Sequence, residues 1–276
     1  MKKILIRSTG AFINLTAPLF PSWNGKFTFD LLCRVRRVGF TPKGKEFIGE
    51  AHTVFLDVDG QFAALHKWGT GPKKLLFMHG WLSNSQRWLP YVDQLNLNQF
   101  TVYALDAPGH GMAKGNYLNL EIYRAAYTAA ITHIGEVDTV ACHSLGSLVS
   151  GYGFLVDEKL PVGRYVIMGT PSGVDALFVY FENILGLSKK AISNLEQKIN
   201  SVLQLPHNEI SIEHFFRKVE KPVLVVHDQG DTITPFEPVK LAARSNRSLN
   251  THFVSGQDHN LRSKETVDKV LEFITE

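Results

Sequence analysis

Cysteine is scarce in this chain of 276 residues, which contains only Cys33 and Cys142. The two lie far apart in the sequence and show none of the short spacings that are typical of metal sites. This count excludes a small domain held together by several disulfides. A single disulfide between Cys33 and Cys142 stays an alternative. Because so few cysteines favour a reducing compartment, we expect a cytoplasmic protein. Because the cysteines lack metal-site spacing, we expect no bound metal ion.

A strong excess of one charge is also lacking. The formal net charge is +3 and the sequence pI is about 8.7. A nucleic-acid-binding protein concentrates Lys and Arg on one face, so this mild balance indicates no nucleic-acid partner. No uninterrupted apolar run is long enough to cross a bilayer. The basic and apolar start is similar to a secretory signal, but Arg7 and Asn14 interrupt it and no clear small-residue cleavage site follows, so we do not expect cleavage.

The first fifty residues mix large apolar side chains with a basic cluster. We expect residues 1–50 to form an N-terminal extension that packs its apolar face on the main domain. The alternative is an interfacial segment that contacts anionic lipid, which would make the protein a peripheral membrane partner. The basic cluster consists of Arg34, Arg36, Arg37, Lys43 and Lys45.

From His52 onward the sequence alternates between strand and helix patterns. His52–Val58 and Phe62–Trp68 alternate apolar and polar residues around Asp59-Gly60, which predicts a β-hairpin. Later apolar runs are short and end in turn residues, which is typical of strands buried on both faces. These runs are Lys74–Gly80, Phe100–Asp106, Val137–His143, Arg164–Gly169, Pro222–Asp228 and Thr251–Ser255.

Helical patterns separate these strands, at Ser85–Leu95, Leu118–Ile134, Leu145–Val156, Pro235–Arg244 and Ser263–Ile274. Such an alternation predicts an α/β fold over residues 51–276, with a mostly parallel sheet and helices on both faces. Residues 171–218 contain no strand pattern and show helical spacing of apolar residues. We interpret them as a small helical lid over the edge of the sheet where the strands end, because open α/β sheets bind ligands there.

The strongest local motif is Ala141-Cys142-His143-Ser144-Leu145-Gly146, at the junction of a buried strand and a helix. It resembles the nucleophile elbow G-x-S-x-G of the α/β-hydrolase superfamily, with Cys142 where the first Gly is usual. Small residues are needed there because the turn is tight and the serine is strained. The alternative is that Ser144 only caps the following helix. The resemblance implies that Ser144 is a nucleophile.

The same resemblance implies an acid and then a histidine, in that chain order. His259 lies in a loop just after the last strand, at the edge where a general base is needed, whereas His252 lies inside that strand. The segment from His227 to Pro235 is similar to the family pattern H-G-x-x-D-x-x-x-P, which indicates Asp231 as the acid. Asp228 stands where that pattern has Gly, so an exchange of roles between the two aspartates stays open.

Two further segments complete the resemblance. Met78-His79-Gly80-Trp81 is similar to the H-G-x turn of the family, which implies an oxyanion hole formed by the backbone N–H groups of Trp81 and Leu145. The segment from Asp106 to Gly111 matches the family form D-x-P-G-H-G, and we assign it to loop structure because it precedes Ser144. Together these segments are identified as those of an α/β-hydrolase.

The implied reaction is hydrolysis of a carboxylic ester or related acyl bond through an acyl-enzyme, without any cofactor. The apolar residues of the lid indicate a small-molecule substrate with an apolar moiety, although they are equally consistent with simple packing of the lid. The same side chains could serve an acyltransferase, a thioesterase, an amidase or a carbon–carbon bond hydrolase. A binding protein of this fold without turnover is a further alternative. The sequence gives no oligomeric state.

Overall fold

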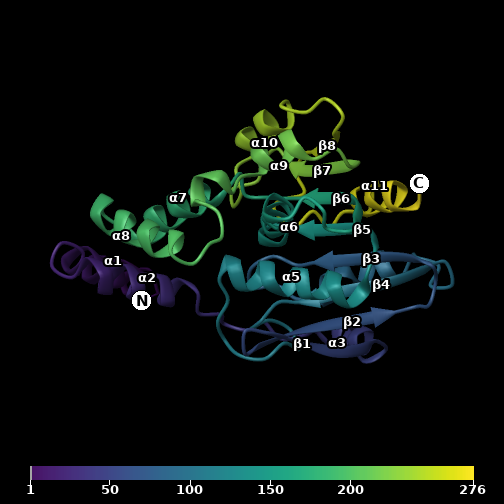
Figure 1. The fold of residues 1–276 in the computed structure, drawn as a ribbon, viewed down its shortest axis with the longest axis horizontal. Coiled ribbons are helices and arrows are strands. Elements are labelled where there is room, and N and C mark those ends of the chain that lie inside the picture. Colours follow the sequence, from purple (N-terminus) through teal and green to yellow (C-terminus); the bar gives the residue numbers. More distant parts are fainter. Residues whose placement is uncertain (1) are drawn as a thin grey trace.

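The computed structural model describes residues 2–276, with side chains from Ile4 onward. Figure 1 shows a central sheet flanked by helices, with a group of helices set apart from it. The strands are β1 (His52–Val58), β2 (Gln61–Trp68), β3 (Lys73–Met78), β4 (Phe100–Asp106), β5 (Val137–His143), β6 (Val162–Met168), β7 (Val223–Asp228) and β8 (Asn250–Val254). The α-helices are α1 (Lys2–Thr16), α2 (Pro21–Leu32), α3 (Pro42–Gly49), α4 (Leu89–Val92), α5 (Leu120–Ile134), α6 (Leu145–Val156), α7 (Val174–Leu185), α8 (Lys189–Asn200), α9 (Ile212–Lys218), α10 (Phe236–Ala243) and α11 (Lys264–Thr275).

The eight strands form one sheet in the order β1-β2-β4-β3-β5-β6-β7-β8. β1 and β2 form the predicted hairpin, whose turn at Asp59 and Gly60 has positive φ angles of 51° and 79°. β2 also pairs antiparallel with β4, whereas all pairs from β4 to β8 are parallel. The predicted α/β fold with an antiparallel edge is therefore confirmed.

Both faces of the sheet are buried, because successive side chains of a strand point to opposite sides. In β3, Leu76 and Met78 pack in a core with α5 and α6, whereas Leu75 and Phe77 pack in a core with α4 and α11. This explains why the parallel strands appear in the sequence as continuous apolar runs. β1, β4, β5 and α6 have the predicted bounds. The helix predicted at Ser85–Leu95 is a 3₁₀ helix over Ser85–Trp88 followed by the short α4, and the other predicted elements differ by a few residues at their ends.

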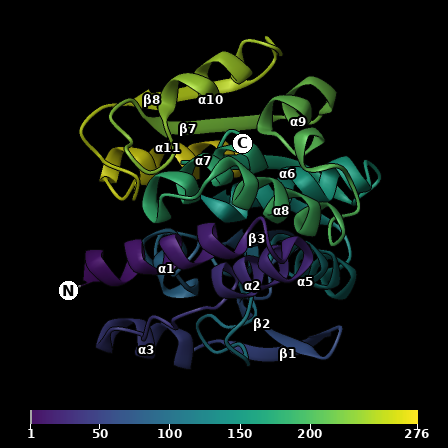
Figure 2. The same cartoon turned by 90° about the vertical axis from the view of Figure 1, so that its left-hand side faces the viewer.

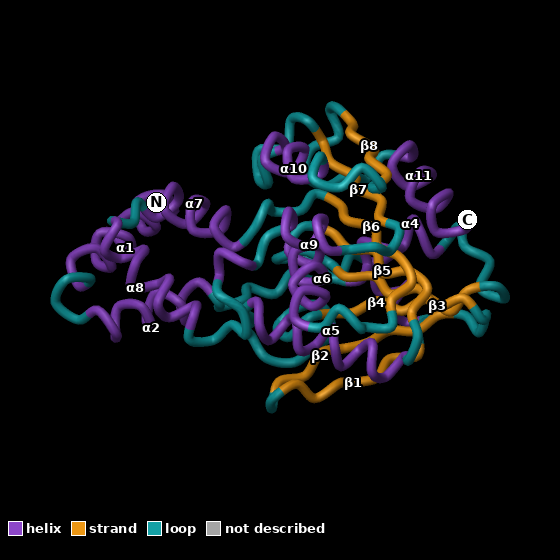
Figure 3. Tube along the Cα trace, turned by 45° about the horizontal axis from the view of Figure 1, so that its top comes forward, coloured by secondary structure: helices purple, strands orange, loops and turns teal. Residues whose placement is uncertain are grey.

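The insertion at residues 171–218 divides into two parts. Helices α7 and α8 stand away from the sheet, next to α1 and α2 (Figures 1 and 3). Helix α9, in contrast, belongs to the main core, since Phe215 and Phe216 are fully buried there. The ring of Phe215 packs on Phe154 and Tyr165, so the chain has already returned to the body before β7 begins.

The N-terminal fifty residues also divide into two parts. Helix α3 packs on the body, where Phe47 stacks on Trp68 at 4.4 Å between ring centroids. Helices α1 and α2 pack instead on α7 and α8, which lie beside them in Figure 2. We call these four helices the cap. In the contact between α1 and the pair α7 and α8, Ile13 and Ala17 are buried against Leu185, Leu187 and Ala191.

Glycines let the cap helices approach closely. A Cβ atom at Gly25 would lie 2.4 Å from the carbonyl oxygen of Asn194, and one at Gly10 would overlap that of Leu185. Buried amide groups add polar contacts, because Asn194 Nδ2 donates to the carbonyl of Ala17 at 3.0 Å and to Asn24 Oδ1 at 3.1 Å. Close packing and these hydrogen bonds together fix α2 against α8.

The segment after α2 attaches the cap to the body. The backbone N–H of Val35 donates to the carbonyl of Asn116 at 2.8 Å, and that of Leu118 donates to Cys33 at 2.9 Å. Arg37 donates to the carbonyls of Gly111 and Gly115 in the same loop. None of the described helices is both long enough and apolar enough to cross a bilayer.

Candidate active site

Ser144 occupies the sharp turn between β5 and α6. Its φ and ψ angles are 54° and −122°, a conformation that is strained for any residue with a side chain. Space for the turn comes from neighbouring glycines, because a Cβ at Gly80 would lie 2.7 Å from Cβ of Ser144, and one at Gly146 would lie 2.7 Å from the carbonyl oxygen of His79. Ser144 makes no side-chain cap hydrogen bond, so the interpretation as a simple helix cap is not supported.

Cys142, which replaces the usual first glycine of the motif, lies inside the sheet and is fully buried. Its neighbours are core residues of the α5–α6 side, so the extra side chain is accommodated by packing. Burial raises the pKa of the Cys142 thiol to about 12. The thiol therefore stays protonated near neutral pH and is a poor nucleophile.

His259 connects Ser144 to a carboxylate. It lies in the loop after β8, where Nε2 is 2.9 Å from Ser144 Oγ and Nδ1 is 2.8 Å from Asp231 Oδ2. Its backbone is held by His143, whose Nε2 donates to the His259 carbonyl at 2.8 Å. Burial lowers the pKa of His143 well below its usual value, so this second ring is neutral. The structure thus brings together all three side chains that the sequence indicates.

The two aspartates after β7 have different surroundings. Asp228 accepts hydrogen bonds from the backbone N–H groups of Gly230 at 2.7 Å and Gln257 at 2.6 Å, which joins two loops. Asp231 is the carboxylate beside His259. Burial acts to raise the pKa of Asp231, but hydrogen bonds from His259 and from Thr234 outweigh burial and lower it to about 2. The carboxylate is therefore ionised at neutral pH.

Thr234 is a site residue that the sequence interpretation did not identify. Its Oγ1 donates to Asp231 Oδ2 at 2.7 Å and lies 3.1 Å from His259 Nδ1. The backbone N–H groups of Ile233 and Thr234 also donate to Asp231 Oδ1, at 2.8 and 3.0 Å. The available signal was the spacing Asp-x-x-Thr, in which an aspartate holds the turn that follows it.

Trp81 and Leu145, the two expected oxyanion-hole residues, line the same cavity as Ser144 and His259. Within the residues that the structure describes, neither backbone N–H has a hydrogen-bond acceptor. Leu145 is also the first residue of α6, whose N-terminus favours negative charge. Both donors are thus available to a ligand, and only main-chain atoms are involved.

Asp106 lies outside this group. It is fully buried and binds His66 Nε2 at 2.9 Å, Ser85 Oγ at 2.8 Å and the backbone N–H of Met112 at 2.8 Å. Burial acts to raise the pKa of Asp106, but the hydrogen bonds from the His66 ring and from the Met112 N–H outweigh burial and lower it below its usual range. The D-x-P-G-H-G segment therefore has the expected structural position, holding loops beside the site.

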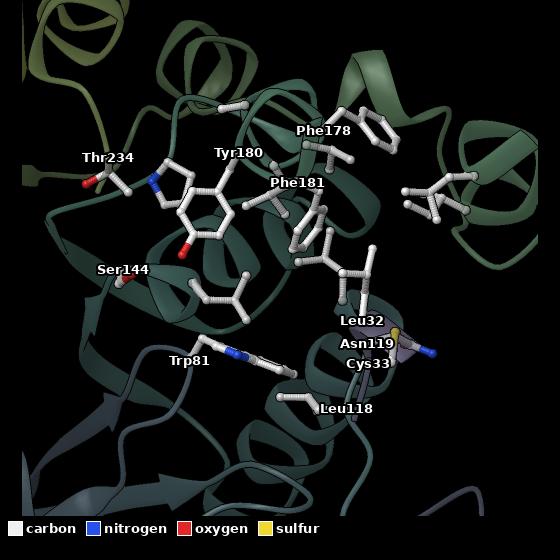
Figure 4. A pocket seen from close by; sticks show the side chains of 18 of the residues that line it. Leu32, Cys33, Trp81, Leu118, Asn119, Ser144, Phe178, Tyr180, Phe181 and Thr234 are labelled. Carbon is white, nitrogen blue, oxygen red and sulfur yellow. The ribbon is translucent and has the colours of Figure 1, made fainter. Parts of the chain in front are cut away.

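A cavity of about 500 Å³ opens beside Ser144. Figure 4 shows Ser144 at one side, with Trp81, Leu118, Tyr180 and Phe181 among the side chains around the hollow. Its walls come from the body, from the lid and from α2, which the sequence interpretation did not connect with the site. The α2 side is lined by Phe29, Leu32 and Cys33, whose i, i+3, i+4 spacing marks one helix face. In the described residues no three His, Cys, Asp or Glu side chains are grouped to hold a metal ion.

Comparisons with known proteins agree with this architecture. A sequence model described as "Alpha/beta hydrolase family" matches residues 75–266. A solved bromoperoxidase from Bacillus anthracis superposes with a TM-score of 0.62 at 15% identity, covering 82% of this chain and 100% of that one. A carboxylesterase from Bacillus subtilis gives a TM-score of 0.60 at 15% identity, covering 84% and 94%. At such identities these structures show a shared fold alone.

One curated relative is more similar in sequence over a short stretch. It is the dihydrolipoyllysine-residue acetyltransferase component of an acetoin cleaving system from Cupriavidus necator, 32% identical over 97 residues. The match spans 35% of this chain and only 25% of that protein. The chain therefore corresponds to a small part of this relative.

Proposed function

The chain belongs to the alpha/beta hydrolase family, and we propose that it is a serine hydrolase that cleaves a carboxylic ester with an apolar moiety. The observation that supports this most is the continuous contact from Ser144 Oγ through His259 to Asp231, with distances of 2.9 and 2.8 Å. A hydroxyl, an imidazole and a carboxylate in that order form the arrangement that activates a serine.

In the proposed reaction, Ser144 Oγ attacks the ester carbonyl and transfers its proton to Nε2 of His259. Asp231 keeps the histidine proton on Nδ1 and stabilises the imidazolium that forms. Thr234 orients Asp231 through its hydroxyl and its backbone N–H. Because the carboxylate has a lowered pKa, it keeps its charge throughout the turnover.

The carbonyl oxygen becomes negatively charged when Ser144 adds to it. The backbone N–H groups of Trp81 and Leu145 are the proposed donors to this oxyanion, and loss of one such donor typically costs about 10²–10³ in rate. His259 then protonates the leaving alkoxide, which departs as the alcohol. Water then transfers a proton to His259 and attacks the carbonyl of the acyl-enzyme. This step releases the carboxylic acid and returns the proton to Ser144 Oγ.

The apolar lining of the cavity supports the substrate class. Phe29, Leu177 and Phe181 are among the side chains that would contact an acyl chain or an apolar alcohol. The number of buried methylene groups then sets the affinity, at about 0.8 kcal/mol each. Transfer of the acyl group to another acceptor would use the same residues, and competition between water and added alcohols separates the two outcomes.

The test is labelling with a fluorophosphonate probe followed by peptide mapping. We expect label on Ser144 in the wild type and none in Ser144→Ala, with both proteins showing the same cooperative thermal unfolding. A folded wild type that takes no label would contradict the proposal. A series of nitrophenyl esters of increasing acyl length then tests the pocket, because kcat/KM should rise with chain length and a flat response would exclude the apolar site.

We also propose a cytoplasmic location. Cys33 and Cys142 are both free and buried, and this supports a compartment that keeps thiols reduced.

A further inference from the structure

Helix α1 is apolar on two sides, and only one of them is covered. Its inner side packs on α7 and α8 through Ile13 and Ala17, which are fully buried. Its outer side and the turn to α2 expose large apolar side chains to solvent. We call these residues the outer apolar face: Ile4, Leu5, Phe12, Leu15, Leu19, Phe20 and Trp23.

This outer apolar face is continuous along the helical hairpin that α1 and α2 form. Its residues follow the helical repeat from Ile4 and Leu5 through Phe12 and Leu15, so they project from one side of α1. The ring of Phe12 contacts that of Trp23 at 6.2 Å between centroids, which links α1 to α2. Leu15 and Leu19 are 69% and 65% exposed. Contiguous apolar surface of this kind is typical of an interaction site.

Charge is segregated in the same part of the chain. Residues 1–45 contain nine Lys or Arg and one acidic residue, Asp30, which gives a net charge of +8. The remaining residues contain twenty Lys or Arg and twenty-five Asp or Glu, which gives −5. Asp30 is itself paired with a cation, because its Oδ2 lies 2.5 Å from Nζ of Lys26. Four of the nine basic residues belong to α1 and α2, which carry a net charge of +3, and the other five follow in the connecting segment and in α3.

We propose that α1 and α2 dock the protein on the surface of an anionic membrane. An apolar helix face on a segment with an excess of basic residues is the composition that binds in the interface of an anionic bilayer. Charge complementarity selects this occupant over a second copy that docks through the same face, because two basic segments would repel each other. The apolar side chains enter the boundary of the headgroups and acyl chains, and Trp23 lies at the polar level.

Docking through this hairpin has a consequence for the cavity. The opposite side of α2 contributes Phe29, Leu32 and Cys33 to the cavity wall. A single helix pair therefore separates the membrane contact from the cavity beside Ser144. The proposal does not depend on hydrolysis, since binding is measured equally well with Ser144→Ala.

The test is flotation of the full chain with vesicles of phosphatidylcholine alone or mixed with phosphatidylglycerol. We expect binding to the mixed vesicles, with little binding to phosphatidylcholine. Raising the salt from about 0.1 to about 1 M should weaken the binding, because the Debye length falls from about 10 to about 3 Å. A wild type that does not float with anionic vesicles would overturn the proposal.

Variants localise the effect. Leu15→Ser with Leu19→Ser should lower the partition coefficient at least about tenfold, since two large apolar side chains no longer enter the apolar boundary of the bilayer. Leu241→Ser is the matched control, because Leu241 is 67% exposed on α10 in the body, and it should leave binding unchanged. Equal binding by the double variant and the control contradicts the proposal.

A second variant covers the case in which the first does not fold. Ile4→Ser with Leu5→Ser removes the same surface at the start of α1 and should cause a similar loss. Sedimentation velocity without lipid tests the other occupant. A wild-type dimer that Leu15→Ser with Leu19→Ser converts to a monomer, together with no vesicle binding, would assign the outer apolar face to a second copy and refute the membrane contact.

Discussion

The body around Ser144 and the cap of α1, α2, α7 and α8 are constructed in different ways. In the body, each candidate side chain lies within five residues after the end of a strand, and the family match covers residues 75–266. In the cap, helices from distant parts of the chain meet, as when Asn194 bonds Asn24 from 170 positions away. The family match begins after α1, α2 and α3. Local motifs therefore specify the body, whereas the cap depends on packing between distant parts of the chain.

The largest effect should come from the carboxylates of the body. Asp231→Asn should lower kcat by about 10³–10⁴-fold, because an amide holds the wrong tautomer of His259. Asp228→Asn is the control, since Asp228 bonds only loop N–H groups, and it should keep kcat within about tenfold. Steady-state hydrolysis of a nitrophenyl ester by both variants measures the difference. Equal losses would remove the distinction between the two aspartates.

A smaller effect should come from the cap. Gly25→Val should push α2 away from α8, because a Cβ there would lie 2.4 Å from the carbonyl of Asn194. The displaced Phe29 and Leu32 would then lose contact with a long acyl chain. We expect KM for a long-chain ester to rise about tenfold, which corresponds to about 1.4 kcal/mol, while KM for an acetate ester stays the same.

Gly49→Val is the matched control for this change. Gly49 lies in α3 on the body, where an added Cβ meets no atom within 4 Å, so both KM values should stay at the wild-type level. If Gly25→Val raises KM for both esters equally, or for neither, then the cap does not form the acyl wall.

A further difference, in stability and not in catalysis, should appear in the pH dependence of unfolding. Burial lowers the pKa of four body histidines below their usual value: His79, His110, His143 and His227. Unfolded chains bind protons at these positions near pH 6.5 while the folded body does not. The free energy of unfolding should therefore fall as the pH decreases from 7 to 5, by up to about 1.4 kcal/mol per pH unit for each proton.

Urea denaturation at both pH values measures this trend, and His143→Gln should reduce the difference between them. The cap helices contain no histidine, so destabilisation by acid should originate in the body. Stability that stays constant or rises on acidification would contradict the assignment of these rings as neutral.

The sequence was sufficient to predict the fold because its signals are local. The strand Val137–His143 and the helix Leu145–Val156 are continuous segments whose patterns need no distant partner. The same holds for Ser144 as a candidate, since its motif is confined to a strand-to-turn junction. Its proposed role, together with those of Asp231 and His259, stays a prediction that labelling and kinetics can test.

What sequence analysis did not provide depends on contacts between distant segments. The role of Thr234 was not predicted, because it depends on how the fold places Asp231 and His259 around its hydroxyl. Helix α2 lines the cavity because α8 holds it there, and no local pattern specifies that pairing. Helix α9 was grouped with the lid, although Phe215 lies in the main core. Amphipathic spacing shows that a helix has an apolar face, but it does not show which surface that face will meet.

The order of synthesis gives the cap one further property. Ile13 and Ala17 at the end of α1 pack on Leu185 of α7, so the ribosome makes α1 long before its packing partner. At about 5–20 residues per second, the intervening chain takes roughly ten to thirty seconds to emerge. During that interval α1 has both apolar sides uncovered, since neither α7 nor α8 yet exists. Helix α1 is thus translated well before the helices that cover it and is among the last elements to reach its final place, so the nascent chain must remain unaggregated until then.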